Sequence, residues 1–369
     1  MEARIMAEAA IAIQNYMDLN DEACQARALK AKESLGSKLV ILGHHYQREE
    51  VIRFADYSGD SLKLSRQAAA SDAKYIVFCG VHFMAEVADI LSRPDQVVVL
   101  PDLAAGCSMA DMADLAKVER AWKELGQIID TQKIIPVTYI NSAANLKAFC
   151  GRHGGIVCTS SNARAVLNWA FEQGEKVLFF PDQHLGRNTA YKMGIPLEQM
   201  VVWNFLRSRG GLIPEKIRDA KIILWQGHCS VHQMFQPEHI DRFLERYPDA
   251  KVISHPENSF EVCQKSHYIG STEYIIKTIT ESPPNTRWLV GTELNLVNRL
   301  HERFKHEGKF IHFMSPTVCM CSTMFRTDPQ HLAWSLENLA QDNIVNQIKV
   351  PEKDAELARL TLDRMLEIS

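Results

Sequence analysis

The sequence predicts an α/β fold in which parallel sheets are covered by helices, divided into three similar three-layer αβα blocks. Two observations carry this prediction. Short aliphatic runs alternate with amphipathic helical segments from about residue 36 onward, the pattern of parallel sheets. Three of the runs also begin alike, which indicates an internal repeat: Lys38-Leu39-Val40-Ile41-Leu42, Lys133-Ile134-Ile135-Pro136-Val137 and Lys221-Ile222-Ile223-Leu224-Trp225.

The remaining elements follow from local patterns. Residues 1–35 are expected to be helical, with Gly36 as the stop. The tail, residues 328–369, spaces leucines between charged residues and is expected to form surface helices without chemistry. The alternative to an internal repeat, an ordinary alternation of strands and helices, stays open. Two further strands are expected in each block, at 75–79 and 96–100, at 155–158 and 176–180, and at 251–254 and 288–290.

Composition narrows the functional classes. The 369 residues are 46% hydrophobic and 23% charged, enough for two or three packed units. A net charge of -4, with scattered basic residues, argues against nucleic-acid binding. The apolar runs are too short to span a membrane, and the acidic N-terminal segment does not resemble a secretory leader, so a cytoplasmic location is expected. Nine cysteines fit no secreted disulfide framework.

Titratable and polar side chains follow the expected strands. In parallel sheets the carboxyl ends of the strands carry the functional groups, and helix N-termini there offer backbone donors. If the three blocks meet tip to tip, one central cavity collects these side chains. They are His44, His45, Tyr46, Cys107, Tyr139, Asn141, Cys229, His232, His255 and Glu257.

Three cysteines stand out because each lies in a loop after an apolar run: Cys107, Cys229 and Cys321. They could share one site only if the fold brings distant segments together. No CxxC pair occurs, which argues against a zinc ribbon or a ferredoxin-like cluster. Cys319 and Cys321 lie two residues apart, and at most one of them is expected to be a ligand. The other cysteines are expected to be small buried hydrophobic residues.

A set of ordered phrases resembles quinolinate synthases over about residues 36–340. The phrases are His44-His45-Tyr46-Gln47, Gly59-Asp60-Ser61-Leu62, Ala105-Gly106-Cys107-Ser108-Met109-Ala110-Asp111, Tyr139-Ile140-Asn141, Cys158-Thr159-Ser160-Ser161-Asn162, Phe180-Pro181-Asp182, Gly227-His228-Cys229-Ser230-Val231-His232, His255-Pro256-Glu257, Gly270-Ser271-Thr272 and Gly291-Thr292-Glu293.

This resemblance implies three related domains around a pseudo-threefold axis, with a central cavity that holds a [4Fe-4S] cluster. We expect domain boundaries at 1–127, 128–218 and 219–327, followed by a helical tail, 328–369. The resemblance implies that three cysteines hold the cluster and leave one iron open as a Lewis acid. Cys107, Cys229 and Cys321 match these ligands. Cys321 is preferred over Cys319 because the family phrase runs Cys, two residues, Met, which fits Cys321 and Met324.

The activity implied by the resemblance is condensation of iminoaspartate with dihydroxyacetone phosphate to quinolinate, with loss of phosphate and two waters. This reaction belongs to de novo NAD biosynthesis and implies an aspartate oxidase that supplies iminoaspartate. Proton transfer in such a reaction needs histidine, a tuned carboxylate or a phenol. By resemblance, His44, Tyr46, His232 and Glu257 line the cavity, with Tyr46 and Glu257 as proton carriers and His232 beside the cluster.

The substrates are polyanions, and the chain has no P-loop to hold them. Hydroxyl groups and backbone donors must serve instead, although a Ser or Thr at a helix start is more often a simple cap. His44 is expected to contact substrate as well. The residues that match the family's substrate contacts are Ser61, Tyr139, Asn141, Ser160, His255, Ser271 and Thr272.

The chain departs from the family in two places. Asn258 stands where many members have a cysteine, and the CxxCxxC run that ends some members is absent. Two alternatives from other classes stay open. One is an iron-sulfur redox sensor without turnover, which would leave the anion-ready loops unexplained. The other is a zinc-dependent aldolase-type lyase that uses His44, His45, His232 and Glu257 around the metal.

Overall fold

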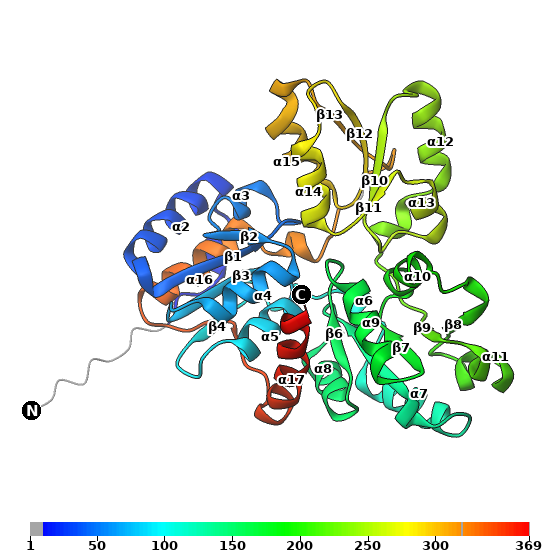
Figure 1. The fold of residues 1–369 in the computed structure, drawn as a ribbon. Coiled ribbons are helices and arrows are strands. Elements are labelled where there is room, and N and C mark those ends of the chain that lie inside the picture. Colours follow the sequence, from blue (N-terminus) through cyan, green and yellow to red (C-terminus); the bar gives the residue numbers. More distant parts are fainter. Residues whose placement is uncertain (1–9, 319, 369) are drawn as a thin grey trace, which may run out of the picture. The chain divides into compact units, whose positions relative to one another are not determined.

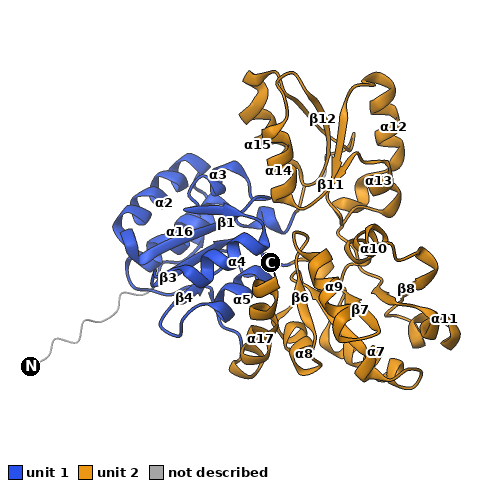
Figure 2. Ribbon diagram, in the orientation of Figure 1, with its two compact units in different colours: residues 1–106, 322–350 blue, residues 107–321, 351–369 orange. Residues whose placement is uncertain are grey.

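The structure, a computed structural model, describes residues 10–318 and 320–368 (Figure 1). Three mostly parallel sheets are flanked by helices, which confirms the predicted α/β class. The chain divides into two compact units (Figure 2). The first comprises the residues up to Gly106 with Ser322–Val350, and the second comprises Cys107–Cys321 with the residues from Pro351. The pseudo-threefold axis, the central cavity and the domain boundaries stay predictions.

The first unit holds one five-stranded sheet in the order β14-β4-β3-β1-β2, in which only β14 is antiparallel to its neighbour. Its strands are β1 (Leu39–His44), β2 (Tyr57–Gly59), β3 (Tyr75–Cys79), β4 (Val97–Val99) and β14 (Gln347–Ile348). Its helices are α1 (Gln14–Met17), α2 (Asp21–Leu35), η1 (Gly36–Lys38), α3 (Glu49–Ile52), α4 (Ser61–Ala70), α5 (His82–Leu91), η7 (Met324–Arg326) and α16 (Pro329–Ala340).

Helices α1 and α2 confirm the expected helical lead-in over the parts that they cover, and residues 1–9 of that prediction lie outside the described residues. Helix α2 ends at Leu35 and is capped by Gly36, whose φ of +51° is a conformation that glycine adopts at little cost. Helix α16 packs against α2 over the sheet. Its leucines Leu332, Leu336 and Leu339 are buried in that core. The prediction that this part of the tail is a surface helix is therefore wrong, because leucines three and four residues apart form an apolar stripe that needs a partner.

The second unit begins with a five-stranded parallel sheet in the order β6-β5-β7-β9-β8. Its strands are β5 (Ile134–Tyr139), β6 (Ile156–Cys158), β7 (Lys176–Phe180), β8 (Met200–Trp203) and β9 (Ile222–Trp225). The accompanying helices are α6 (Ser108–Asp111), α7 (Leu115–Gly126), η2 (Thr131–Lys133), α8 (Ala144–Arg152), α9 (Ala163–Gln173), α10 (Gln183–Lys192), η3 (Leu197–Gln199), η4 (Ser208–Gly211) and α11 (Pro214–Asp219).

Strand β9 corrects one expectation. The run that starts at Lys221 was expected to open the third block, but β9 pairs with β7 and β8 inside the second sheet. All four residues of β9 are buried, so the strand needs a neighbour on each side. Strand β8, which the sequence reading missed, supplies one of these neighbours and forms the edge.

The third sheet is also parallel, in the order β11-β10-β12-β13. Its strands are β10 (Lys251–Ser254), β11 (Tyr268–Ile269), β12 (Arg287–Gly291) and β13 (Phe310–Phe313). Its helices are η5 (His232–Met234), α12 (Pro237–Arg246), α13 (Phe260–Lys265), α14 (Thr272–Glu281), α15 (Leu294–Phe304) and η6 (Lys305–Glu307).

The last helix, α17 (Glu352–Ile368), returns to the second unit and packs against α8. The two helices approach closely at Gly151, where a Cβ atom would lie 2.3 Å from the carbonyl oxygen of Leu357. Ala358, Leu362 and Met365 are buried in this contact, whereas Arg359 and Asp363 are exposed, so α17 is the expected surface helix, with one face buried. No helix in the described part of the chain is both long and apolar enough to cross a membrane.

Candidate active site

In the first unit, predicted site residues gather where β1 and β2 end. His44 is the last residue of β1, and its ring meets the Tyr46 ring edge to face at 4.7 Å. The backbone N–H of Tyr46 donates to His44 Nδ1 at 3.1 Å, so a neutral His44 carries its proton on Nε2. Ser61 begins α4, but Asp60 supplies the cap. The capping role weighed for Ser61 is therefore filled by its neighbour, and its contact with substrate stays a prediction.

In the second unit, a buried carboxylate joins three predicted residues from different strand ends. Glu257 follows β10 and is 4% exposed, while His232 lies after β9 and is 1% exposed. The Tyr139 hydroxyl, at the end of β5, donates to Glu257 Oε1 at 2.5 Å. His232 Nδ1 lies 2.9 Å from Oε2, and His255 Nδ1 lies 3.8 Å from Oε1. The fold thus brings together residues that are far apart in the sequence.

The charge of Glu257 follows from these neighbours. Burial by itself raises the pKa of Glu257, but His255, His232 and the Tyr139 hydroxyl outweigh burial and hold the pKa below its usual range. The carboxylate is therefore ionised at neutral pH. Burial lowers the pKa of His255 to about 4, against the opposing effect of Glu257, so that its imidazole is neutral.

An ionised carboxylate only accepts hydrogen bonds, which sets the orientation of His232. Its Nδ1 must carry the hydrogen that Glu257 accepts, and in the neutral imidazole Nε2 is then an acceptor. Nε2 lies 3.4 Å from the Thr292 hydroxyl, which can donate to it. The His232 and His255 rings stack at 4.9 Å with a 14° angle between their planes. A neutral His232 is therefore held with its Nδ1 as a hydrogen-bond donor and its Nε2 as an acceptor, each in a fixed direction.

Two buried asparagines fix the loop that carries Glu257. Asn188 Nδ2, from α10, donates to the carbonyl oxygens of Pro256 and Asn258, both at 2.9 Å. Asn258 Nδ2 in turn donates to the carbonyl oxygen of Gly291 at 2.9 Å. The sequence reading missed Asn188 and noted Asn258 only as a departure from the family. Here Asn258 holds the loop against the end of β12, because its side-chain amide donates to a backbone carbonyl group there.

The three predicted cluster ligands all belong to the second unit. Cys107 immediately precedes α6, Cys229 lies between β9 and η5, and Cys321 follows β13. All three are half-buried thiols that form no disulfide among the described residues. The Cys229 sulfur and ligand atoms of His232 and Glu257 lie within 4.8 Å of one another. Cys319, the alternative third ligand, lies outside the described residues.

Electrostatics couples the three thiols. Burial raises the pKa of Cys107 to about 12, and charges on Cys321 and Glu257 act in the same direction. Burial also raises the pKa of Cys229 well above its usual range, with further contributions from Glu257, Cys321 and Cys107. Thiolates so placed need a nearby positive charge to be stable. A cationic iron centre provides that charge, so this donor set fits an iron-sulfur cluster.

A methionine links the segments that carry two of these thiols. The Trp225 indole N–H, at the end of β9, donates to the carbonyl oxygen of Met112 at 3.0 Å. The backbone N–H of His228 contacts Met112 Sδ at 3.4 Å. Between them, Gly227 runs so close to another loop that a Cβ atom would lie 2.2 Å from the carbonyl oxygen of Pro181. The position of the Cys229 loop therefore depends on a glycine.

Replacing Gly227 with alanine is expected to displace the Cys229 loop. The added methyl group meets backbone, which cannot rotate away, so we expect a loss of about 1–3 kcal/mol of stability. We also expect lower iron content, measured together with the thermal unfolding midpoint. Gly126→Ala, at the end of α7, is the control, because an added Cβ atom there would meet only the Thr131 side chain, at 3.2 Å. Wild-type iron content and unfolding midpoint in Gly227→Ala would show that the close approach does not position the loop.

A second group of predicted residues lines a pocket of about 260 Å³ in the second unit, which includes Ser160 and Ser271. Ser271 caps α14 by accepting the backbone N–H of Tyr274 at 3.3 Å, so the simple capping role holds for it. Arg164 and Lys192 line the same pocket. The sequence reading missed both, although Arg164 lies only four residues beyond Ser160. Two cations beside two hydroxyl groups suit an anion.

Asn141 and Thr272 complete the predicted contacts of the second unit. Asn141 Oδ1 is buried and accepts no hydrogen bond from the described residues. A buried, unsatisfied amide oxygen is costly, and a bound ligand with a donor group would satisfy it. Thr272 is buried at the first position of α14. That all these side chains contact one substrate stays a prediction.

Comparisons with a family model and with individual proteins agree on one family. The family model described as Quinolinate synthetase A protein matches residues 26–367. The quinolinate synthase of Acidobacterium capsulatum is 55% identical over 360 residues, which cover 97% of this chain and 96% of that protein. The quinolinate synthase of Rhodopirellula baltica is 55% identical over 368 residues, 96% of this chain and 93% of that protein. The resemblance that the sequence motifs predicted is confirmed, and the chain belongs to the quinolinate synthase family.

Proposed function

We propose that this chain condenses iminoaspartate with dihydroxyacetone phosphate to form quinolinate, with loss of inorganic phosphate and two waters. The observation that carries this proposal is the buried network of Tyr139, His232 and Glu257 next to the Cys229 thiol. Condensation, dehydration and ring closure each need protons moved at fixed positions. The reaction serves de novo NAD biosynthesis, and an aspartate oxidase is the proposed source of iminoaspartate.

Cys107, Cys229 and Cys321 would hold a [4Fe-4S] cluster. Bound there by three thiolates, the cluster would supply an iron with an open position that acts as a Lewis acid. The mutual coupling of the three thiols supports this assignment. His232 and Glu257, whose ligand atoms lie within 4.8 Å of the Cys229 sulfur, would present hydrogen-bonding groups to a reactant.

Glu257 would act as a proton acceptor whose strength depends on its surroundings. With Tyr139 and His232 both donating to it, the carboxylate is a weak base. A bound anionic reactant brings negative charge close and raises the pKa of a carboxylate. Glu257 can then take a proton from substrate, while the Tyr139 hydroxyl can return one. His44, Tyr46 and Ser61 are proposed to contact substrate, with Tyr46 as a further proton carrier.

Anionic groups of the substrates would be held by neutral donors and by cations. Ser160, Ser271 and Thr272 offer hydroxyl groups near helix N-termini, which favour negative charge. Arg164 and Lys192 supply positive charge beside two of them. His255, which is neutral, would add a hydrogen bond without adding charge.

The direct test is anaerobic reconstitution with iron and sulfide, followed by an assay for quinolinate. Oxaloacetate and ammonia supply iminoaspartate, and dihydroxyacetone phosphate is the second substrate. We expect quinolinate and phosphate to appear in equal amounts. A protein that binds about four irons and four sulfides but forms no quinolinate would contradict the proposed activity and favour a redox sensor.

A second candidate rests on one geometric observation. A thiol, an imidazole and a carboxylate, from Cys229, His232 and Glu257, lie close enough to bind a single zinc ion. A zinc-dependent aldolase-type lyase would use such a site. A colourless protein that is active with zinc and without iron would favour this candidate, whereas a brown protein with activity proportional to iron would exclude it.

Asn141 offers a test of substrate contact. If its buried amide oxygen accepts a hydrogen bond from substrate, Asn141→Ala is expected to raise KM about tenfold and to change kcat much less. Steady-state kinetics with each substrate varied in turn measures the split. Asn145→Ala is the matched control, because Asn145 Oδ1 is also buried without a hydrogen-bond partner among the described residues but lies on α8, outside the predicted site. Equal effects of the two variants would show that the Asn141 effect is structural.

A further inference from the structure

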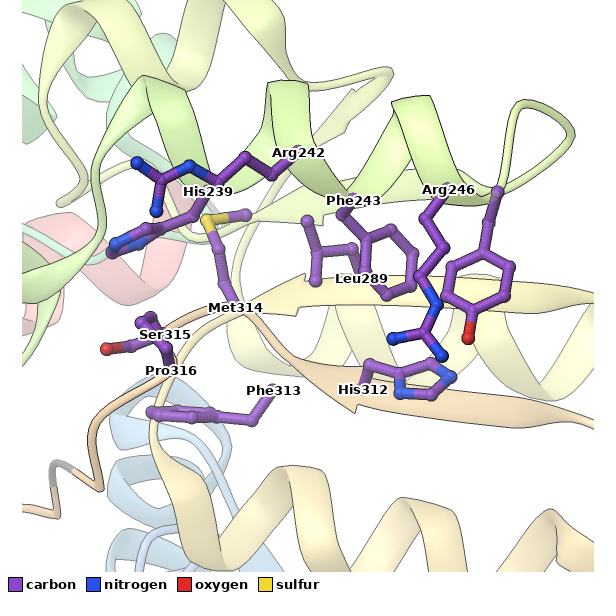
Figure 3. Close-up of a pocket in the computed structure, with 11 residues that line it drawn as sticks. His239, Arg242, Phe243, Arg246, Leu289, His312, Phe313, Met314, Ser315 and Pro316 are labelled. Atoms are coloured by element: carbon purple, nitrogen blue, oxygen red, sulfur yellow. The ribbon is translucent and has the colours of Figure 1, made fainter.

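A second pocket lies away from the candidate active site, in the third sheet. Its volume is about 350 Å³, and α12, β12 and the end of β13 form its walls (Figure 3). None of the predicted site residues lines it. Its described lining includes two arginines and no aspartate or glutamate. The pocket is therefore electropositive and within the size range that holds a small ligand.

Two arginines supply the charge. Arg242 and Arg246 are one turn apart on α12, where like charges repel and weaken the helix. Neither forms an ion pair with the part of the chain that the structure describes. Asp241, the acidic neighbour of Arg242, pairs with Lys265 at 2.5 Å. Two guanidinium groups without an acidic partner in one pocket are suited to an anionic ligand.

The space between the two guanidinium groups is apolar. Figure 3 shows Phe243 and Leu289 between the Arg242 end of the pocket and the Arg246 end. The Phe243 ring lies 5.1 Å from the His312 ring, at an interplanar angle of 60°. A flat aromatic group could pack against this surface while charged groups reach the arginines.

His312 adds a directed hydrogen-bond donor. Arg287 Nη1 lies 3.1 Å from His312 Nε2, and because a guanidinium group only donates, Nε2 is the acceptor. A neutral His312 therefore carries its proton on Nδ1. Burial, together with Arg287 and Arg246, lowers the pKa of His312, so the ring is neutral at pH 7. The positive charge of the pocket comes from the arginines and does not depend on this histidine.

We propose that this pocket binds a nucleoside monophosphate, with the phosphate on one guanidinium group and the base over Phe243 and Leu289. Arginine binds phosphate in a bidentate manner and also stacks on aromatic rings, so the second guanidinium group can contact the base. The opposite wall includes Met314, Ser315 and Pro316, which lead toward Cys321 along the chain. An occupant would thus contact the segment that carries a predicted cluster ligand.

The test is isothermal titration calorimetry of the full chain, purified anaerobically, with AMP as the probe. We expect one binding site per chain. Arg242→Gln and Arg246→Gln are each expected to weaken binding about tenfold, as the loss of a charge-assisted hydrogen bond does, and the double variant should abolish it. Adenosine and inorganic phosphate, each offering half of the contacts, should bind at least tenfold more weakly than AMP.

The matched control is Arg303→Gln, an exposed arginine on α15 that does not line the pocket, and its AMP affinity should equal that of the wild type. Far-ultraviolet circular dichroism of the double variant should match the wild type. No saturable AMP binding to the wild type, or AMP binding that the double variant retains, would overturn the proposal. Inorganic phosphate binding as tightly as AMP would overturn the assignment of an aromatic ligand.

Discussion

Replacing Cys107, Cys229 or Cys321 with alanine is expected to abolish cluster retention and quinolinate formation together. Each thiol would supply one of only three protein ligands, and the loss of one exposes a second iron and weakens the hold on the whole cluster. Wild-type protein should hold about four irons and four sulfides after anaerobic reconstitution, and each variant should hold far less. Iron and sulfide analysis with the visible absorption spectrum measures retention, and the quinolinate assay measures activity.

Cys319→Ala is the control for Cys321, because it removes a thiol two residues away in the same segment. It should keep both iron content and activity near wild type. A cluster that survives in any of the first three variants would break the assignment of that ligand. Loss of the cluster in Cys319→Ala with retention in Cys321→Ala would transfer the third ligand to residue 319.

Replacing Glu257 with glutamine is expected to lower kcat by about 10²- to 10⁴-fold, the usual contribution of a positioned acid or base. The amide keeps the shape of the side chain but cannot accept a proton, and it can no longer accept from both Tyr139 and His232 on two charged oxygens. Because glutamine leaves the three thiols in place, iron content should stay at the wild-type level. Single-turnover measurement of quinolinate formation would isolate the chemical steps.

The matched control for this variant is Glu261→Gln, which removes a carboxylate from an exposed position on α13. Its kcat should remain that of the wild type. If Glu257→Gln retained kcat within about twofold, with iron content unchanged, Glu257 would not be the proton acceptor, and Tyr46 would be the next candidate.

Local sequence patterns located many strands. The runs expected at 75–79, 176–180 and 251–254 are strands β3, β7 and β10 with the same bounds. A strand that is buried on both faces needs a continuous apolar run, and such a run is visible in the sequence itself. The apolar runs did not show which sheet each strand joins. Strand β9 resembles the first strand of a new block, yet its hydrogen bonds go to β7 and β8.

In the candidate site too, some residues were predictable from the sequence and others were not. The types and places of His232, Glu257 and the cysteines were predictable because reactive side chains gather beyond strand ends. Asn188 was not, since its partners are backbone carbonyl groups about seventy residues further along the chain. Arg164 and Lys192 line one pocket from two different helices, α9 and α10. The sequence of neither helix indicates that the two side chains come together.

By itself, the sequence determined the α/β class, the family and the residue types of the candidate site, because apolar periodicity and ordered motifs are properties of the chain read in one dimension. The tertiary structure decided which sheet β9 joins, where the tail helices are buried and which side chains surround Glu257. Those outcomes depend on hydrogen bonds and burial between segments that are distant in the chain, and these contacts exist only once the chain has folded.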